Sequence, residues 1–457
     1  MIKNSSELIS NGLDDVTHGL RKDACTILES ALNSVNPEQA IYNALHLNGD
    51  TLSFEGGSID LSKVKRIYVI GGGKAGGLMA KAVESLFGDR IKDGLVNVLE
   101  GTVNTVSLKQ IKLHGAHHPV PSKAGVEGVK QMLELTGNLC EDDLVISLIS
   151  GGGSALMPYP AIGIDLDDLQ SITGSLLRAG ATINELNAVR KHLSAFKGGQ
   201  LARHCSPARV ISLILSDVIG DPLDIIASGP TAPDTSSFED ALMVLQKYGV
   251  WVDAPENIRT RINQGVEGII PDTPKEDDPV LNKVHNILIA NNLIAAKAAK
   301  KKAAELGYNT MILSTFIEGE ARLVGEILTG IAKEIIKRDQ PLKKPAAVII
   351  GGETTVSVKG NGVGGRNMEV ALGAALRLDG LSCLVAALAT DGIDGPTESA
   401  GAFADGRTLK RSMEKDLNPE KYLRKNDSYH FFKELDDYIL TGPTGTNVND
   451  LSLILIR

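Results

Sequence analysis

Short apolar runs alternate with longer amphipathic stretches along most of this chain. Eight runs have the length of a buried strand, at residues 66–70, 95–99, 144–149, 210–215, 286–289, 311–313, 346–350 and 384–388. Five stretches carry apolar residues every three to four positions, the spacing of an amphipathic helix, at residues 75–87, 123–139, 166–178, 292–306 and 318–337. Because alternating strands and helices build mainly parallel sheets with helices on both faces, the pattern predicts an α/β fold.

The chain is long enough for two cores. It has 457 residues, more than a typical single domain, so a ligand site in a cleft between two domains is expected. Residues 271–279 read Pro-Asp-Thr-Pro-Lys-Glu-Asp-Asp-Pro, which cannot form a core element. We therefore predict one α/β domain over residues 1–274 and a smaller one over residues 275–457.

Charge and composition exclude several classes of protein. The net charge of -9 comes from 56 acidic and 47 basic residues that are mixed along the chain, so nucleic acid is not an expected partner. No apolar stretch approaches the roughly 20 residues of a membrane span, and the first 29 residues lack the apolar core of a signal peptide. The four cysteines are scattered singly. We expect a cytoplasmic protein with reduced thiols and no membrane partner.

The loop after the first apolar run has the residues of an anion site. It reads Gly-Gly-Gly-Lys-Ala-Gly at residues 71–76 and leads into a predicted helix, so backbone N–H groups and a helix N-terminus converge there. Gly71, Gly73 and Gly76 also have the G-x-G-x-x-G spacing of a dinucleotide site, with Glu100 as the candidate ribose acid. Lys74 adds a positive charge that suits a transferring phosphate better.

A second glycine loop follows the most apolar run. Gly151, Gly152, Gly153 and Ser154 come directly after residues 144–149. The G-x-S-x-G spacing of a serine nucleophile is absent. We therefore expect this loop to contact phosphate or sugar hydroxyls. We expect the first loop to bind phosphate through its glycines Gly71, Gly72, Gly73 and Gly76.

Charged residues gather near two other strand ends. Asp217 and Asp221 follow residues 210–215, where they could hold Mg²⁺, accept a hydroxyl proton, or simply form a solvated turn. Arg190 and Lys191 lie in a predicted helical segment. They could bind a carboxylate substrate or form an ordinary charged helix face.

The second predicted domain repeats this arrangement. Arg366 stands at the start of an alanine-rich helix, and Asp391 and Asp394 follow the run at residues 384–388. If the two domains close on each other, Lys74 and Arg366 could hold a transferring phosphoryl group from two sides. His117 and His118 are adjacent and lack a third ligand at useful spacing, so a loop role is expected for them.

In their order along the chain, these segments resemble the class II glycerate kinases, a two-domain family whose second half is the MOFRL domain. The resemblance covers nearly the whole chain. Its bearers are residues 71–76, 118–121, 150–156, 187–194, 216–221, 228–231, 351–355, 364–369 and 390–397. It implies a Rossmann-like N-terminal domain, a smaller C-terminal domain and an active site in the cleft between them.

The resemblance also implies a reaction and its residues. The expected activity is phosphorylation of D-glycerate by ATP with Mg²⁺, at the 2-hydroxyl, with Lys74 and Arg366 as the catalytic pair. For the other residues we hypothesise from their types and positions alone that Asp217 orients or deprotonates the hydroxyl and that Arg190 and Lys191 bind the substrate. Asp217, Asp391 and Asp394 are the candidate metal ligands.

Two positions depart from the pattern of the family. Met368 stands where the family usually has Gln, and Ser122 stands where it usually has an acid. The polar contacts of these two loops are therefore open, whereas the proposed catalytic pair is unaffected.

Other functions fit parts of the same pattern. The G-x-G-x-x-G spacing would also suit an NAD(P)-dependent hydroxypyruvate reductase, although Lys74 has no role there. Phosphorylation at the 3-hydroxyl and a non-catalytic regulator that binds a nucleotide or sugar phosphate are further alternatives. The expected partners are small molecules, and a homodimer is compatible with the sequence.

Overall fold

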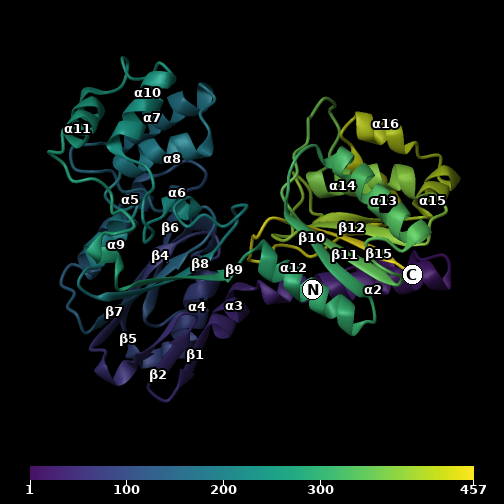
Figure 1. Cartoon of the computed structure of the whole chain (residues 1–457), viewed down its shortest axis with the longest axis horizontal. Coiled ribbons are helices and arrows are strands. Elements are labelled where there is room, and N and C mark those ends of the chain that lie inside the picture. Colours follow the sequence, from purple (N-terminus) through teal and green to yellow (C-terminus); the bar gives the residue numbers. More distant parts are fainter. The chain divides into compact units, whose positions relative to one another are not determined.

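The computed structural model describes residues 1–457 and divides into two compact units (Figure 1). The central unit comprises residues 37–289, and the terminal unit comprises residues 1–36 together with residues 290–457. No helix in either unit is both long and apolar enough to cross a membrane. The predicted α/β class is confirmed, because each unit is built on a six-stranded sheet accompanied by helices.

The first residues of the chain belong to the terminal unit, although we expected them in the first domain. Helix α2 (Asp15–Ser34) packs against α12 (Asn292–Glu305). The guanidinium of Arg21 on α2 is fully buried, 2.7 Å from Asp405 and 2.6 Å from Asp437. Since a buried cation needs such partners, these ion pairs hold α2 in the terminal unit.

The expected boundary near residue 274 lies elsewhere in the structure. The proline-rich segment packs on the central unit, where the Thr273 hydroxyl is buried and donates to Asp234 over 3.0 Å. The His192 ring lies 2.8 Å from Asp272 of the same segment. Strand β9 (Val284–Ala290) then joins the edge of the central sheet, so the division between the units follows β9.

The central sheet has the strand order β6-β5-β4-β7-β8-β9. Its other strands are β4 (Arg66–Gly72), β5 (Ile91–Leu99), β6 (Ile111–Ala116), β7 (Asp143–Ile149) and β8 (Arg209–Leu215). These five strands pair in parallel, and the order changes direction between β4 and β7. This is the doubly wound order of a Rossmann-like sheet, in which ligands bind at the carboxyl ends of the strands where the order reverses.

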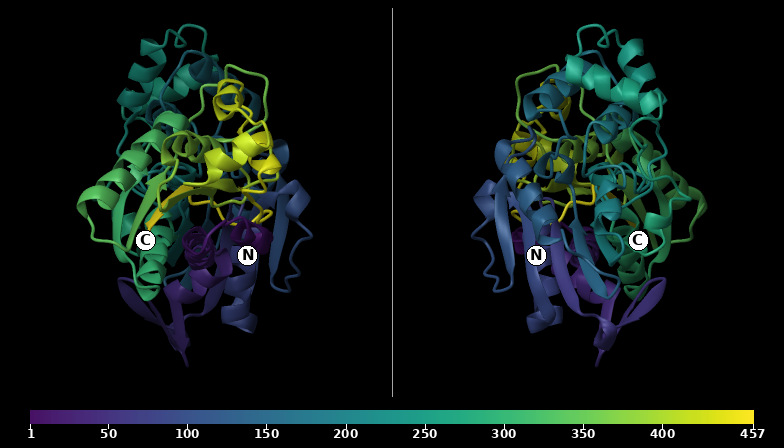
Figure 2. Two further views of the ribbon diagram at one scale, coloured as in Figure 1. Left: turned by 90° about the vertical axis from the view of Figure 1, so that its right-hand side faces the viewer. Right: turned by 90° about the vertical axis from the view of Figure 1, so that its left-hand side faces the viewer.

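Helices and a small second sheet complete the central unit. The sheet β1-β2-β3 is the purple extension at the bottom of Figures 1 and 2. Helices α7, α8, α10 and α11 form a separate cluster with its own apolar core. The bounds are α3 (Pro37–Ala44), β1 (Leu45–Asn48), β2 (Thr51–Phe54), β3 (Gly57–Asp60), α4 (Gly76–Phe87), α5 (Lys123–Leu135), α6 (Gly153–Leu156), α7 (Leu166–Arg178), α8 (Ile183–His192), α9 (Gln200–Cys205), α10 (Phe238–Lys247) and α11 (Glu256–Val266).

The terminal unit has three layers (Figure 1). Helices α13 and α14 pack on one face of its sheet, and α2 and α12 pack on the other. The bounds are α1 (Ser5–Ser10), β10 (Asn309–Ile317), α13 (Ala321–Arg338), β11 (Ala346–Gly352), α14 (Arg366–Leu378), β12 (Cys383–Ala389), β13 (Gly401–Asp405), α15 (Thr408–Glu414), α16 (Pro419–Arg424), α17 (Ser428–Glu434), β14 (Tyr438–Ile439) and β15 (Asp450–Ile456).

The terminal sheet is not mainly parallel, and our expectation was wrong there. Its order is β10-β11-β15-β12-β13-β14, and only β10 and β11 pair in parallel. We did not predict β13, β14 or β15. Because β15 runs antiparallel between β11 and β12, its first residue, Asp450, lies opposite Gly352 and Ala389 at the carboxyl ends of those strands.

Candidate active site

The two glycine loops of the central unit lie side by side at the point where the strand order reverses. The Lys74 N–H donates to the carbonyl of Gly151 over 2.9 Å, and the Ser150 N–H donates to the carbonyl of Gly72 over 3.3 Å. The Ala75 N–H donates to the Ser150 hydroxyl over 3.1 Å. The loops after β4 and β7 are therefore joined into one surface.

Two glycines are required for this close approach. A Cβ at Gly73, whose φ is 146°, would collide with the side chain and carbonyl of Ser150. Gly152 has a φ of 80°, and a Cβ there would lie 3.2 Å from both His118 and Lys74. Burial and the charge of Lys74 lower the pKa of His118. His118 thus borders both loops, and it belongs to no group of three His, Cys, Asp or Glu side chains that could hold a metal ion.

Helix α4 begins in the same place. Its N-cap is Ala75, and no side chain caps its first turn. The first N–H groups of a helix and its dipole attract anions when no side chain occupies them. The exposed Lys74 side chain adds a full charge next to this helix start.

Asp217 joins the surface from β8. Its carboxylate lies against Gly151, so closely that a Cβ at Gly151 would collide with it. Asp221 instead forms part of a turn, with a φ of 55° and its N–H donating to the carbonyl of Val218 over 3.1 Å. The structure thus brings Asp217 to the glycine loops.

A buried lysine that we did not predict lies behind the second loop. The Lys197 ammonium donates to the carbonyl and the hydroxyl of Ser154 over 2.5 and 2.6 Å, and Lys197 is 1% exposed. The Arg190 guanidinium lies 3.5 Å from the same carbonyl. Burial and the neighbouring Arg190 lower the pKa of Lys197 well below its ordinary range. Neither cation forms an ion pair with a carboxylate.

Hydroxyl and amide groups surround these two cations. The hydroxyls of Ser154 and Ser228 lie 2.9 Å apart, and Ser228 donates to Asn187 over 3.0 Å. The only sequence signal for Lys197 is its place before Gly198 and Gly199, which both have positive φ. That signal marks a tight turn and does not reveal an ion site.

Lys191 does not accompany Arg190, although we expected both to face the substrate. The Lys191 ammonium is buried, 2.7 Å from Asp234 and 3.2 Å from Asp224. Successive helical residues point in different directions, so α8 sends Arg190 toward Ser154 and Lys191 toward these two acids. We therefore assign Lys191 no contact with a substrate.

In the terminal unit, Arg366 begins α14 and lies between two acids. Its Nε and Nη2 donate to the two carboxylate oxygens of Asp450 over 2.6 and 3.0 Å, and its Nη1 donates to Glu353 over 2.6 Å. Burial raises the pKa of Asp450 to about 6, although Arg366 opposes that shift. We did not predict Asp450, and the only available signal was an acid directly before an apolar run.

Asp394 caps the start of α14. It is buried, and its carboxylate accepts the N–H groups of Asn367 and Met368 over 3.0 and 2.8 Å. Burial raises its pKa to about 7, against the effect of those N–H groups. Asp391 accepts the N–H of Ile393 over 3.0 Å. Nowhere in the 457 residues do three His, Cys, Asp or Glu side chains gather as a metal site.

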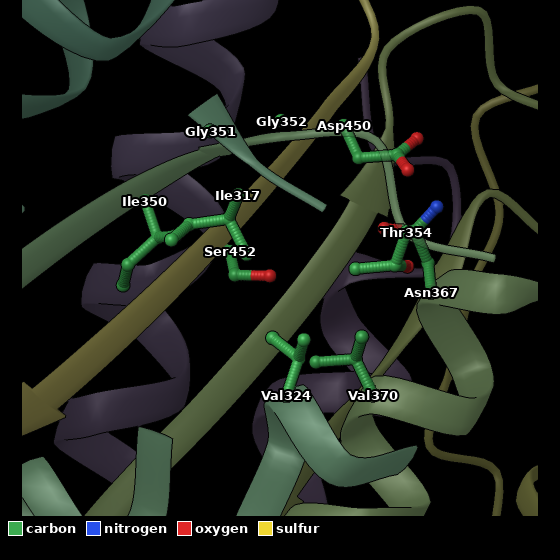
Figure 3. Close-up of a pocket in the computed structure, with 10 residues that line it drawn as sticks. All are labelled: Ile317, Val324, Ile350, Gly351, Gly352, Thr354, Asn367, Val370, Asp450 and Ser452. Carbon is green, nitrogen blue, oxygen red and sulfur yellow. The ribbon is translucent and has the colours of Figure 1, made fainter. Parts of the chain in front are cut away.

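A small cavity lies beside Arg366 in the terminal unit. Figure 3 shows the polar groups of Thr354, Asn367 and Asp450 at one end of it and the side chains of Val324 and Val370 at another. Its volume is about 10 Å³, roughly the space of one water molecule. It cannot hold a substrate.

Fold and loops together define a doubly wound α/β protein with two joined glycine-rich loops, one of them carrying Lys74, where its strand order reverses. Two family models match the chain, the domain of unknown function DUF4147 over residues 23–263 and the MOFRL family over residues 346–450. The chain belongs to the class II glycerate kinase family, which confirms the resemblance drawn from the sequence.

Relatives over nearly the full length support this assignment. The chain is 42% identical to a D-glycerate 2-kinase of Thermotoga maritima over 439 residues, 96% of this chain and 98% of that one. It is 40% identical to a glycerate 2-kinase of Pyrococcus horikoshii over 438 residues, 96% of this chain and 97% of that one. A crystal structure of the glycerate kinase from Thermotoga maritima is similar with a TM-score of 0.87 and 41% identity, covering 96% of this chain and 100% of that one.

Proposed function

We propose that this protein is a glycerate kinase that transfers the γ-phosphoryl group of ATP to the C2 hydroxyl of D-glycerate. The observation that carries the proposal is one glycine-rich surface with cations on both sides, the exposed Lys74 and the buried Lys197 with Arg190. A kinase of an acid must hold phosphates and a carboxylate next to each other. Relatives named glycerate 2-kinases at 40% and 42% identity support the same reaction.

In this proposal the glycine loops hold the phosphates of ATP. Backbone N–H groups can approach a phosphate closely only where no side chain intervenes, and Gly71, Gly72, Gly73 and Gly76 with Gly151, Gly152 and Gly153 leave that space. Lys74 adds a donor that follows the transferred group. Such positioning and charge stabilisation is most of what a kinase contributes to phosphoryl transfer.

Arg366 is the second proposed catalytic cation. Its planar guanidinium can donate to two phosphoryl oxygens at once, as it donates to the two oxygens of Asp450 in this structure. The proposal requires Arg366 to exchange part of this pairing for the phosphoryl group. Asp450 and Glu353 would then hold the arginine in position before substrate binds.

The residues present fit a Mg²⁺ ion that binds together with ATP. Magnesium in kinases is usually held by one or two carboxylates plus substrate phosphates, and Asp217 at the glycine loops meets that requirement. Asp391 is the second candidate, and Asp394 is set aside because it caps α14. When bound, Mg²⁺ offsets negative charge on the phosphates.

We also propose that Asp217 orients the C2 hydroxyl of glycerate or accepts its proton. This role and metal binding have different consequences in an Asp217→Asn variant. Loss of a metal ligand raises the Mg²⁺ concentration needed for half-maximal activity. Loss of the proton acceptor lowers kcat even at saturating Mg²⁺.

A coupled assay tests the reaction and its position. The protein is incubated with ATP, Mg²⁺ and D-glycerate, and the product is coupled first to enolase alone and then to phosphoglycerate mutase with enolase. We expect a response with enolase alone, since enolase accepts only the 2-phosphate. A response that requires the mutase would indicate the 3-hydroxyl.

Two control assays address the remaining alternatives. Oxidation of NADH or NADPH in the presence of hydroxypyruvate, without ATP turnover, would support the reductase. Binding of ATP without any turnover would support a regulator. We further propose a cytoplasmic location, which suits the four free cysteines, and a homodimer, which light scattering in solution can test.

A further inference from the structure

Two buried lysines in the central unit, six positions apart, have opposite electrostatic surroundings. Lys191 is 2% exposed and pairs with Asp234 and Asp224. Lys197 is 1% exposed and donates to the carbonyl and hydroxyl of Ser154, and the neighbouring charge that acts on it, by lowering its pKa, is the cation Arg190. Lys191 therefore has the partners of a structural ion pair, and Lys197 lacks them.

An unpaired buried ammonium is unfavourable for folding. Removing a lysine from water costs several kcal/mol unless an opposite charge compensates it, and a second cation nearby adds repulsion. The third fully buried cation of the chain, Arg21, follows the rule with two carboxylates within 2.7 Å. The exception at Lys197 and Arg190 is explained if an anion from outside the chain supplies the missing charge.

The groups around Lys197 suit a small hydroxy acid. The hydroxyls of Ser154 and Ser228 and the amide of Asn187 form a connected polar network beside the two cations. Such groups can exchange hydrogen bonds with substrate hydroxyls while the cations bind a carboxylate. The exposed Lys74, whose side chain lies next to Gly152 of the neighbouring loop, is the better partner for a bulky triphosphate.

We propose that Lys197 and Arg190 form the subsite for the carboxylate of the hydroxy acid, and that Lys197 determines the preference for an acid over a neutral polyol. This inference rests on the proposed kinase function. It adds Lys197 as a specificity-determining residue and gives Arg190 a partner other than Lys191.

The test compares Lys197→Met and Lys191→Met with the wild-type enzyme. For Lys197→Met, we expect KM for D-glycerate to rise at least about 100-fold and KM for ATP to change by less than about threefold. The ratio of kcat/KM for D-glycerate to that for glycerol, which lacks the carboxylate, should fall by a similar factor. A purely structural lysine would not move the KM of one substrate alone.

Thermal unfolding provides the matched control. Lys197→Met should leave the Tm unchanged or raise it, because an uncompensated buried charge is removed. Lys191→Met should lower the Tm, because it leaves Asp234 and Asp224 without their cation. If Lys197→Met unfolds, Arg190→Gln replaces it in the kinetic assay with the same expected rise in KM for D-glycerate.

Each outcome bears on the proposal. An unchanged KM for D-glycerate, or a rise confined to ATP, would overturn the carboxylate subsite, the latter by assigning the cations to phosphate. Wild-type enzyme without activity on D-glycerate would instead reject the proposed function. The two failures are therefore distinguishable.

Discussion

Strands β4 and β11 end in the same backbone arrangement and then continue with opposite charges. Gly71 has a φ of 140°, and a Cβ there would collide with the carbonyl of Leu148 on the neighbouring strand. Gly352 has a φ of 146°, and a Cβ there would collide with the carbonyl of Ile317 in the same way. After β4 the chain continues into a glycine loop with Lys74. After β11 the chain continues directly into the acidic residue Glu353.

The same backbone arrangement at a strand end therefore occurs next to two different charge environments. In the central unit, the buried Lys197 behind the loops donates to Ser154 and forms no ion pair with a carboxylate. In the terminal unit, Arg366 is already paired with Asp450 and Glu353. The buried lysine of the central unit thus lacks an opposite charge within the chain, whereas Arg366 of the terminal unit has two carboxylate partners.

Replacing Lys74 should have the largest effect, because it removes the mobile charge of the central loops. For Lys74→Met we expect kcat to fall about 10³-fold, the size of effect seen when a key donor to a transition state is lost. Steady-state kinetics with D-glycerate and ATP measure it. Lys81→Met on α4 is the control, since its exposed pair with Glu38 contributes little. A Lys74→Met enzyme with near-normal kcat would contradict the catalytic role.

The counterpart in the terminal unit is Arg366→Lys, for which we expect kcat to fall about 100-fold. Lysine keeps the charge but loses the planar, bidentate geometry that Arg366 uses toward Asp450. Arg377→Lys on the same helix changes an exposed arginine that pairs with the half-buried Glu326, and it should stay near wild-type activity. Equal activity of the two variants would show that bidentate geometry is not needed.

The shared backbone arrangement can be tested without changing charge. A Cβ at Gly73 would collide with Ser150, so Gly73→Ala should destabilise the protein by about 2 kcal/mol and raise KM for ATP about tenfold. Gly77→Ala is the matched control four residues later. A Cβ there makes ordinary contacts with Leu113 and Val106, so stability should stay equal or rise by about 0.5 kcal/mol. Chemical unfolding and ATP titration measure both variants.

The sequence predicts features that depend on neighbouring residues, and it does not predict contacts between residues far apart in the chain. The glycine loops directly follow their apolar strands, so their place at the switch point could be inferred from neighbouring residues alone. Lys191 and Lys197 could not be distinguished, because their difference depends on Asp234, which lies 43 positions from Lys191. A charge pattern does not reveal which acids a lysine meets after folding.

Contacts between residues far apart in sequence also explain why we did not predict the ion pairs of the terminal unit. Asp450 reaches Arg366 only because β15 runs antiparallel between β11 and β12, and we had not predicted that strand. Arg21 meets Asp405 and Asp437 across 384 and 416 positions of sequence. Such pairings are set by topology, whereas periodicity predicts only the individual elements.

The smallest effect that we expect concerns the acids of the terminal unit. Burial raises the pKa of Asp394 from 3.8 to about 7 and that of Asp450 to about 6. In the unfolded chain both groups titrate near their ordinary values, so between about pH 4 and 7 the folded state binds more protons. The contribution of these acids to stability is therefore greatest below about pH 4 and is lost as the pH rises toward 7.

An Asp394→Asn variant isolates one of these acids, because its amide cannot ionise. Loss of one N–H contact to α14 should cost about 1 kcal/mol at every pH. The wild type loses stability as the pH rises and the variant does not. The free energy of unfolding of the variant, relative to that of the wild type, should therefore increase by about 1 kcal/mol per pH unit between pH 5 and 7. Urea unfolding at the two pH values measures the difference. A difference that does not change with pH would mean that the N–H groups of Asn367 and Met368 keep Asp394 ionised throughout, and the terminal network would then carry one more negative charge facing Arg366 than burial alone predicts.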